Sequence, residues 1–319
     1  MAAPLPRPAI AGISYRPATG DDLVACAGIW RDAINDYTRR LNQPDIPDDL
    51  ASILRLYDHL LATDPDGFLV AERAATGGPP AVVAFTTSYR REALWFLSML
   101  FVLPGVQAAG IGRELLRRVM PADGQAVLAT CTDSAQPISN GLYASLGMSP
   151  RMPLIRLVGR ADRDGHLPPL PAGVRPVSFV ELDGAAGAHL DDEVTALDRA
   201  TAGFEHVPDH RFVRKEGRHG VLFVDASGHA VGYGYASEAG RVGPIAVADA
   251  ALLAPVIGHL VSSIVPRGAF GVWLPGAAGD AMTALLRAGF RMDGFPCLVC
   301  WDRPIADFSR YVPISPGLL

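Results

Sequence analysis

The chain has 319 residues, of which 49% are hydrophobic and 19% are charged, and its formal net charge is -5. A chain of this length exceeds one ordinary core, so two domains are expected. The composition excludes a largely disordered chain, and the sequence carries no basic stripe of the kind that binds nucleic acid.

Membrane insertion and secretion are excluded by the length and flanks of the apolar segments. The most apolar run, residues 93–103, is too short to cross a bilayer. The N-terminal stretch MAAPLPRPAIAG has prolines where a signal peptide has an uninterrupted apolar region. We therefore expect a cytoplasmic protein with no membrane partner. The sequence leaves both a monomer and a homodimer open.

The hydrophobic periodicity predicts the same order of elements in each half of the chain. Each half begins with helices, continues with a hairpin and a third strand, and then alternates helix and strand. This order is typical of a mixed sheet with helices packed on it, an α/β class. The clearest signals are for helices at 22–40, 47–63, 183–200 and 208–215, and for hairpins at 68–88 and 221–237.

Glycines at helix ends and a linker mark the two copies of the repeat. In both halves a late helix ends at a glycine, Gly147 or Gly289, which is the usual residue for a left-handed helix end. Between the halves, residues 159–173 (GRADRDGHLPPLPAG) are rich in proline, glycine and charge and are typical of a linker. We expect domains at 1–158 and 174–303, followed by a C-terminal tail at 304–319.

Two pairs of residues have spacings that metal sites use. Cys297 and Cys300 lie in the apolar run PCLVCW, which favours a buried strand over a redox or metal pair. His206 and His210 are four apart, but Pro208 lies between them, which favours a polar loop over a pair of metal ligands. No metal is expected.

The segment LSMLFVLPGVQAAGIGRELLRRVM, residues 97–120, carries the clearest functional signal. A strand ending at Val102 leads through a short loop to a helix that opens at Gly110, Ile111 and Gly112. Such a helix start presents backbone N–H groups and a positive dipole end to a pyrophosphate, and glycines let the anion approach closely. A single GxG is also common in tight turns, and neither a Walker loop nor a dinucleotide fingerprint is present.

Together with residues downstream, this segment resembles the GNAT superfamily of N-acetyltransferases. The family's acetyl-CoA loop follows Q/R-x-x-G-x-G/A, and residues 107–112 read QAAGIG. Its penultimate helix commonly ends LYxxxGF, and residues 142–148 read LYASLGM. The resemblance implies an α/β fold with an α+β mixed sheet and two tandem GNAT-like domains. The catalytic, acetyl-CoA-binding domain would be 1–158, and 174–303 would be a degenerate copy.

The resemblance also implies roles for individual residues. Tyr143 matches the general acid that protonates the departing thiolate, its alternative being a packing aromatic. Asn140 is placed to hydrogen-bond the pantetheine, although the commoner position of that amide corresponds to Gln136. The other expected acetyl-CoA contacts are Leu100, Phe101 and Val102 along the pantetheine arm, and Gln107, Ala108, Ala109, Gly110, Ile111, Gly112 and Arg113 around the pyrophosphate.

The reaction also needs an oxyanion donor and a base. The backbone N–H of Phe101 or Val102 is expected to stabilise the oxyanion. Many family members carry a glutamate on the fourth strand, but residues 95–102 have Ser98 as their only polar residue. The base therefore stays open between a chain of waters and four carboxylates, Asp32, Asp36, Glu92 and Asp133.

The second half lacks these residues. Its fourth strand runs into ADAALLAPVIGHL without a glycine at the helix start, and Met282 and Leu285 stand opposite Asn140 and Tyr143. One acetyl-CoA per chain is expected.

These features predict an acetyl-CoA-dependent N-acetyltransferase acting on a small-molecule or peptide amine, by direct attack of the amine on the thioester. The acceptor is expected at the first two helices and their loops, which vary freely on this fold, so its identity is not set by the sequence. The alternative is a non-catalytic acyl-CoA sensor or scaffold. The retained Tyr143 favours the enzyme, and the missing strand carboxylate favours the alternative.

Overall fold

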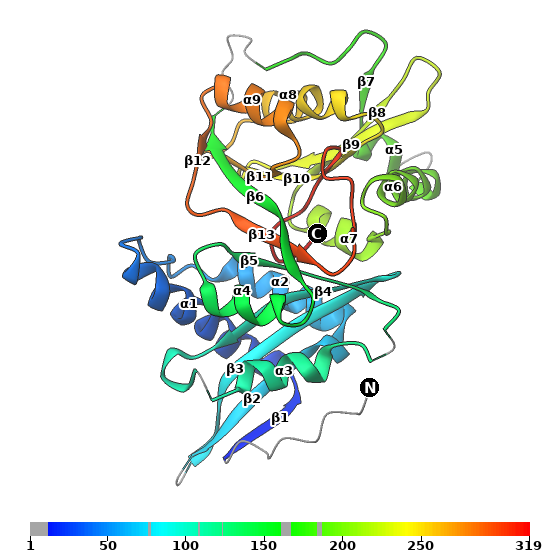
Figure 1. Cartoon of the computed structure of the whole chain (residues 1–319). Coiled ribbons are helices and arrows are strands. Elements are labelled where there is room, and N and C mark those ends of the chain that lie inside the picture. Colours follow the sequence, from blue (N-terminus) through cyan, green and yellow to red (C-terminus); the bar gives the residue numbers. More distant parts are fainter. Residues whose placement is uncertain (1–11, 76–77, 108, 123, 161–166, 184–186) are drawn as a thin grey trace. The chain divides into compact units, whose positions relative to one another are not determined.

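The computed structural model describes residues 12–75, 78–107, 109–122, 124–160, 167–183 and 187–319 (Figure 1). Ala108, the hairpin turn at 76–77 and residues 161–166 of the predicted linker lie outside these residues. The chain forms two compact units. The first consists of Met1–Arg90 with Trp95–Ala126, and the second of Arg91–Leu94 with Val127–Leu319. The domain boundaries predicted from the sequence stay a prediction, and the two units are described separately.

The first unit is built on a sheet in the order β1-β2-β3-β4. Strand β1 pairs antiparallel with β2, and β2 pairs antiparallel with β3. The strands are β1 (Ile13–Pro17), β2 (Phe68–Ala75), β3 (Gly78–Arg91) and β4 (Leu94–Val102). The helices are η1 (Gly20–Asp22), α1 (Leu23–Arg40), α2 (Ala51–Thr63), η2 (Pro65–Gly67), η3 (Pro104–Val106) and α3 (Ile111–Val119).

Alternation along β2 divides the core of this unit between the two faces of the sheet. Phe68 and Val70 point to one face and pack with residues of α1 and α2. Ala71 belongs to the cluster on the other face, where Ile111 and Leu115 of α3 cover the sheet. Helix α3 is therefore held against the sheet by its own apolar stripe, which fixes the loop that precedes it.

The sheet of the second unit runs β5-β13-β6-β11-β10-β9-β8-β7, with β12 paired to β6 and β14 to β10. Its strands are β5 (Val127–Asp133), β6 (Ser149–Gly159), β7 (Arg175–Ser178), β8 (His219–Val224), β9 (Ala230–Ala236), β10 (Arg241–Val247), β11 (Phe270–Pro275), β12 (Arg291–Met292), β13 (Cys297–Trp301) and β14 (Tyr311–Val312). Its helices are α4 (Pro137–Ala144), α5 (Phe179–Asp183), α6 (Gly187–Thr201), α7 (Val207–Lys215), η4 (Ala250–Leu252), α8 (Leu253–Ser263) and α9 (Gly279–Arg287).

Strand β13 joins distant parts of the chain. It pairs antiparallel with β5 on one side, where Val299 is opposite Cys131, and with β6 on the other, where Cys297 is opposite Leu154. Strand β6 in turn pairs with β11. Strands from both halves of the sequence repeat therefore alternate in one sheet.

Helices α8 and α9 lie on one side of this sheet, and α6 and α7 on the other (Figure 1). Gly234 of β9 faces α8, because a Cβ at this position would lie 2.6 Å from Leu260 Cδ1. Tyr233 and Tyr235, its neighbours along the strand, therefore point to the side of α6 and α7, and both are fully buried.

The local predictions are largely confirmed. The predicted helices and hairpins are present within a few residues, and Gly147 and Gly289 have left-handed φ angles of 91° and 90°. The C-terminal segment shows no periodicity in the sequence, yet Val312 and Leu318 are fully buried and β14 extends the pairing of β10. Of the helices that the structure describes, none has both the length and the apolar character needed to cross a membrane.

Candidate active site

Helix α3 begins with an open set of backbone donors. Gly110, its N-cap, has a φ of 85°, a left-handed conformation that favours glycine. The first backbone hydrogen bond of the helix runs from Glu114 N to Gly110 O at 3.0 Å. The N–H groups of Ile111, Gly112 and Arg113 precede that bond and belong to the first turn, which has no intrahelical acceptors. An anion at this helix start meets these donors together with the positive dipole end.

The residues before this helix are shaped by β4. The Gln107 side chain donates from Nε2 to Val102 O at 3.0 Å and so folds back to the end of the strand. Gln107, Ala109 and Arg113 are exposed, whereas Ile111 is buried. Ala108 lies outside the described residues.

Gly112 lies next to strand β4. A Cβ at this position would lie 3.5 Å from Val102 Cγ2 and 3.9 Å from Leu100 Cδ2, which is ordinary van der Waals contact. The Cβ position of Gly112 therefore faces β4, where a methyl group would make ordinary contacts. Its contact with a pyrophosphate stays a prediction.

Strand β4 presents different groups on its two faces and edges. Leu100 and Val102 pack on the α3 side, whereas Phe101 stacks on Phe85 in the opposite core, with ring centroids 5.9 Å apart. Leu103 donates its N–H to Val83 O of β3 at 2.9 Å. Because alternate residues of an antiparallel strand bond to the same neighbour, the N–H of Val102 points away from β3. Of the two candidate oxyanion donors, this one faces the other edge of β4.

In the second unit, Asn140 ties α4 to the end of β5. Its Nδ2 donates to Asp133 O at 3.0 Å and to Gln136 O at 2.8 Å. Its Oδ1 is buried and has no hydrogen-bond partner in the part of the chain that the structure describes. Both N–H groups of the Asn140 amide are therefore used within the protein. Its oxygen, Oδ1, can still accept a hydrogen bond from an N–H group such as those of pantetheine.

Tyr143 lies on the same helix and is 5% exposed. Burial raises the pKa of its hydroxyl, the nearby Cys300 and Cys131 thiols raise it further, and a hydrogen bond with Ser139 opposes the shift. The phenol is therefore protonated throughout the physiological pH range, which is the form that a proton donor requires.

The four carboxylates considered as bases differ in their contacts. Asp36 accepts a hydrogen bond from Arg40 at 2.7 Å, and Asp133 Oδ1 accepts one from Ala135 N at 2.8 Å. Glu92 accepts hydrogen bonds from Arg199 at 2.9 Å and 3.1 Å. Asp32 is 54% exposed at the side chain and lies 3.8 Å from Arg31. No one of them is singled out as the base.

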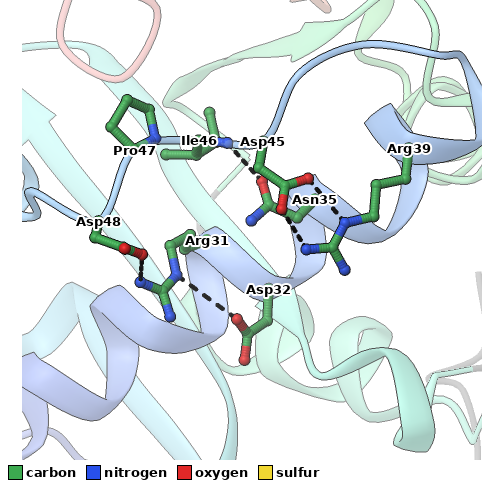
Figure 2. A pocket seen from close by; sticks show the side chains of 8 residues that line it. All are labelled: Arg31, Asp32, Asn35, Arg39, Asp45, Ile46, Pro47 and Asp48. Atoms are coloured by element: carbon green, nitrogen blue, oxygen red, sulfur yellow. Dashed lines mark hydrogen bonds and ion pairs between the residues drawn. The ribbon is translucent and has the colours of Figure 1, made fainter.

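A polar cavity of about 330 Å³ opens beside α1 in the first unit (Figure 2). Asn35 Oδ1 accepts a hydrogen bond from Ile46 N at 2.8 Å and so holds the loop that follows α1. The lining carries three carboxylates and two guanidinium groups, and ion pairs cross it between Arg31 and Asp48 and between Arg39 and Asp45. The lining residues are Arg31, Asp32, Asn35, Arg39, Asp45, Ile46, Pro47 and Asp48.

The corresponding helix start in the second half is closed. The Asp249 side chain accepts a hydrogen bond from Ala251 N at 2.9 Å, which caps η4 just before α8. Leu285 is 1% exposed, and Met282 packs against the same apolar cluster. This region offers a carboxylate where the first half offers the first-turn amides of α3.

The structure confirms the prediction for the cysteine pair and contradicts the one for the histidine pair. Cys297 and Cys300 lie on β13 as predicted, and burial raises the pKa of Cys300 to about 12. The prediction of a polar loop around His206 and His210 is wrong, because His206 is the N-cap of α7 and His210 lies within this helix. Pro208 lies in the first turn of α7, where its missing N–H costs no hydrogen bond, and both histidines are buried.

Comparison with known proteins relates part of the chain to a known family. Residues 27–148 match the model of the acetyltransferase (GNAT) family. The chain is similar to a Pyrococcus horikoshii protein assigned as an acetyltransferase, with a TM-score of 0.72, 17% identity and coverage of 97% of this chain and 96% of that one. No curated protein sequence matches the chain.

Two further solved structures share the fold. A GCN5-related N-acetyltransferase from Sphaerobacter thermophilus has a TM-score of 0.58 at 19% identity, over 94% of this chain and 99% of that one. A tandem GNAT protein from the clavulanic acid biosynthesis pathway has a TM-score of 0.51 at 16% identity, over 92% and 99%. The predicted α/β class with tandem GNAT-like domains is confirmed. Residues 27–148 therefore match the GNAT acetyltransferase family, and the chain has the fold of tandem GNAT proteins.

Proposed function

We propose that this protein transfers an acetyl group from acetyl-CoA to the amine of a small-molecule or peptide acceptor. The observation that carries the proposal is the start of α3, where Gly110 is left-handed and the amides of Ile111, Gly112 and Arg113 precede the first helical hydrogen bond. Such a set of donors suits the pyrophosphate of CoA. It lies within the part of the chain that matches the GNAT family.

The pantetheine and thioester are assigned to three other groups. Asn140 Oδ1, buried and without a partner, accepts a hydrogen bond from a pantetheine amide. Leu100, Phe101 and Val102 align the arm along β4, and the Val102 N–H stabilises the oxyanion.

The chemical step is a direct attack. The neutral amine attacks the thioester carbon, the C–S bond of the tetrahedral intermediate breaks, and Tyr143 gives its proton to the departing thiolate. The amine loses its proton to water or to a nearby carboxylate. The acetyl group ends on the acceptor nitrogen, and CoA leaves as the thiol.

The acceptor is assigned to the cavity beside α1. Its volume of about 330 Å³ suits a small molecule or a peptide end. The excess of carboxylates over guanidinium groups favours an acceptor that arrives as a cation and loses a proton before attack.

We assign the catalytic role to residues 1–158 and a non-catalytic role to the degenerate copy at 174–303. We also propose that the protein is cytoplasmic.

A thiol-release assay tests this proposal. The full chain is incubated with acetyl-CoA and a panel of polyamines, aminoglycosides, amino acids and lysine or N-terminal peptides. An amine-dependent release of CoA is expected for at least one class. If acetyl-CoA binds but no amine accelerates its cleavage, the acyl-CoA sensor or scaffold, which the lack of a carboxylate on β4 favours, replaces the enzyme.

A further inference from the structure

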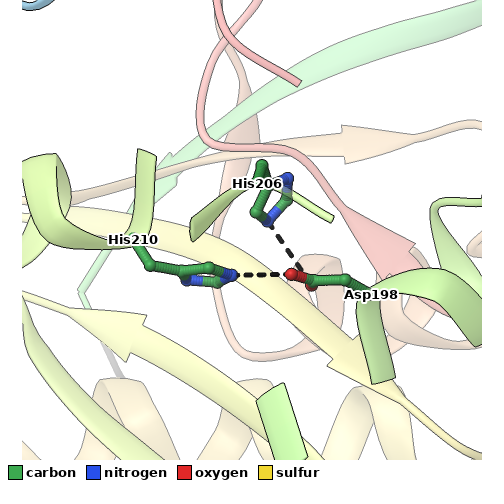
Figure 3. A group of neighbouring side chains, drawn as sticks. All are labelled: Asp198, His206 and His210. Carbon is green, nitrogen blue, oxygen red and sulfur yellow. Dashed lines mark hydrogen bonds and ion pairs between the residues drawn. The ribbon is translucent and has the colours of Figure 1, made fainter. Parts of the chain in front are cut away.

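Three buried side chains of the second unit converge on one point (Figure 3). Asp198 comes from α6, His206 is the N-cap of α7, and His210 lies one turn further along that helix. Their exposed fractions are 0%, 0% and 1%. One ligand atom from each lies within 4.8 Å of the other two. The group is on the face of the sheet that carries Tyr233 and Tyr235, and the proposed acetyl transfer does not use it.

The hydrogen bonds of this group leave one side chain unsatisfied. His210 Nε2 lies 2.9 Å from Asp198 Oδ2, and its Nδ1 lies 3.0 Å from the hydroxyl of Tyr235. Tyr233 donates its hydroxyl to Asp198 Oδ1. His206 is fully buried, yet among the described residues neither of its ring nitrogens has a hydrogen-bond partner, and Nε2 only approaches Asp198 Oδ1 to 3.4 Å. A buried imidazole whose two nitrogens make no hydrogen bond is unfavourable unless something else is bound there.

The buried carboxylate of Asp198 also favours the binding of a cation. In the described part of the chain, the Asp198 carboxylate is met by histidines and a tyrosine and by no arginine or lysine. Arg91 is held by Asp209 in a buried pair with two contacts of 2.8 Å.

We propose that Asp198, His206 and His210 bind a zinc ion. Two imidazoles and one carboxylate form a donor set that zinc prefers, whereas calcium and magnesium favour oxygen ligands alone. The Nε2 of His206 lies 3.4 Å from Asp198 Oδ1, and tetrahedral zinc with bonds of roughly 2.0 Å separates its ligand atoms by about 3.3 Å. A water molecule completes the coordination.

The surrounding residues orient the ligands. Once His210 Nε2 binds the metal, its Nδ1–H donates to Tyr235, and Tyr233 holds the carboxylate of Asp198. Such outer contacts fix the ring and the tautomer of a ligating histidine. The ion joins the end of α6 to the start of α7, so its role is to stabilise this part of the second unit.

Metal analysis of the untagged, full-length protein tests the proposal. One zinc per chain is expected, and after removal of zinc by a chelator, Co²⁺ is expected to bind with the visible absorption of a four-coordinate site. His206→Ala is expected to weaken zinc binding by about 100-fold or more, and Tyr235→Phe, which keeps all three ligands, by about 10-fold. His229→Ala is the control, because this histidine is 81% exposed at the side chain.

The wild-type protein alone can overturn the proposal. If it holds no zinc after purification, takes up none when titrated with Zn²⁺ and gives no Co²⁺ spectrum, the three residues form only a buried polar network. Equal zinc affinity of folded His206→Ala and wild-type protein would also overturn it. If His206→Ala does not fold, Tyr235→Phe and the wild-type titration still decide.

Discussion

The hydroxyl of Tyr143 lies in an environment that keeps it protonated. Burial is the main cause of its raised pKa, and the thiols of Cys131 and Cys300 add to it because a phenolate would lie beside groups of the same potential charge. A phenol with a raised pKa is a weaker acid than a free one. The proposed role of Tyr143 as the acid therefore requires direct contact with the thiolate as negative charge develops on sulfur.

Replacing Tyr143 by Phe keeps the ring and removes the donor. We expect kcat to fall by about 10²-fold, the lower end of what general-acid catalysis supplies, with the affinity for acetyl-CoA unchanged. Tyr57→Phe is a matched control, because Tyr57 is also buried and its hydroxyl has no hydrogen-bond partner. If Tyr143→Phe turns over as fast as the Tyr57 variant, Tyr143 only packs the helix.

A carboxylate in the first unit gives its stability a defined dependence on pH. Arg16 hydrogen-bonds Asp22 through two contacts of 2.8 Å, and this pairing, helped by Thr19 and opposed by burial, lowers the pKa of Asp22 to about 2. Because the folded pKa lies below the unfolded value, the stabilisation is present above about pH 4 and is lost as the pH falls through about 2.

Urea unfolding of the full chain between pH 5 and pH 2 measures this contribution. The wild-type protein is expected to lose about 2 kcal/mol more across this range than Asp22→Asn does. Asp48→Asn is the control, because the Asp48 side chain is 97% exposed. Parallel pH profiles for wild type and Asp22→Asn would show that the Arg16 pair does not lower this pKa.

The roles of some single residues could be predicted from the sequence, and those of others could not. Asn140 was predicted as a pantetheine ligand, but only the structure shows that its NH₂ is used by two backbone carbonyls and that the oxygen is left. Asp198 was not recognised, because it precedes His206 by eight residues and lies on another helix. Proximity that arises from the packing of two helices leaves no local pattern in a sequence.

At the scale of elements, the start of α3 depends on the backbone conformation of one residue. A residue with a Cβ at Gly110 is strained by roughly 1–2 kcal/mol in the left-handed region, and relief of that strain turns the amides of the first turn away from an anion. We expect Gly110→Val to weaken acetyl-CoA binding by about 10-fold or more, as measured by calorimetry. Gly105→Ala is the control, because a Cβ there meets no atom within 4 Å. Equal affinity of both variants would refute the loop assignment.

The helices and hairpins could be predicted because their sequence signals are local, whereas the pairing of distant strands could not. Periodicity and glycine stops predicted the helices and hairpins, and Pro208 was misjudged only because its place in the first turn of α7 was not recognised. The position of β13 between β5 and β6 could not be predicted. An apolar strand such as Cys297–Trp301 is compatible with several neighbours, and the choice among them is made by the packing of the whole sheet.

At the scale of the whole molecule, the two halves of the repeat share a fold but differ at the helix that follows the fourth strand. Helix α3 opens at a left-handed glycine, whereas the approach to α8 is capped by Asp249. An anion at the second position would displace a carboxylate from its amide and face its charge, so its desolvation would not be compensated. We therefore predict that acetyl-CoA binds to one half of the chain only.

Calorimetric titration of the full-length protein with acetyl-CoA tests this account most directly. The predicted result is one binding event per chain, with a stoichiometry of one, that is strongly weakened in folded Gly110→Val and unchanged in Asp249→Asn. A stoichiometry of two, an unaltered site in Gly110→Val or the absence of any binding to the wild-type protein would contradict it.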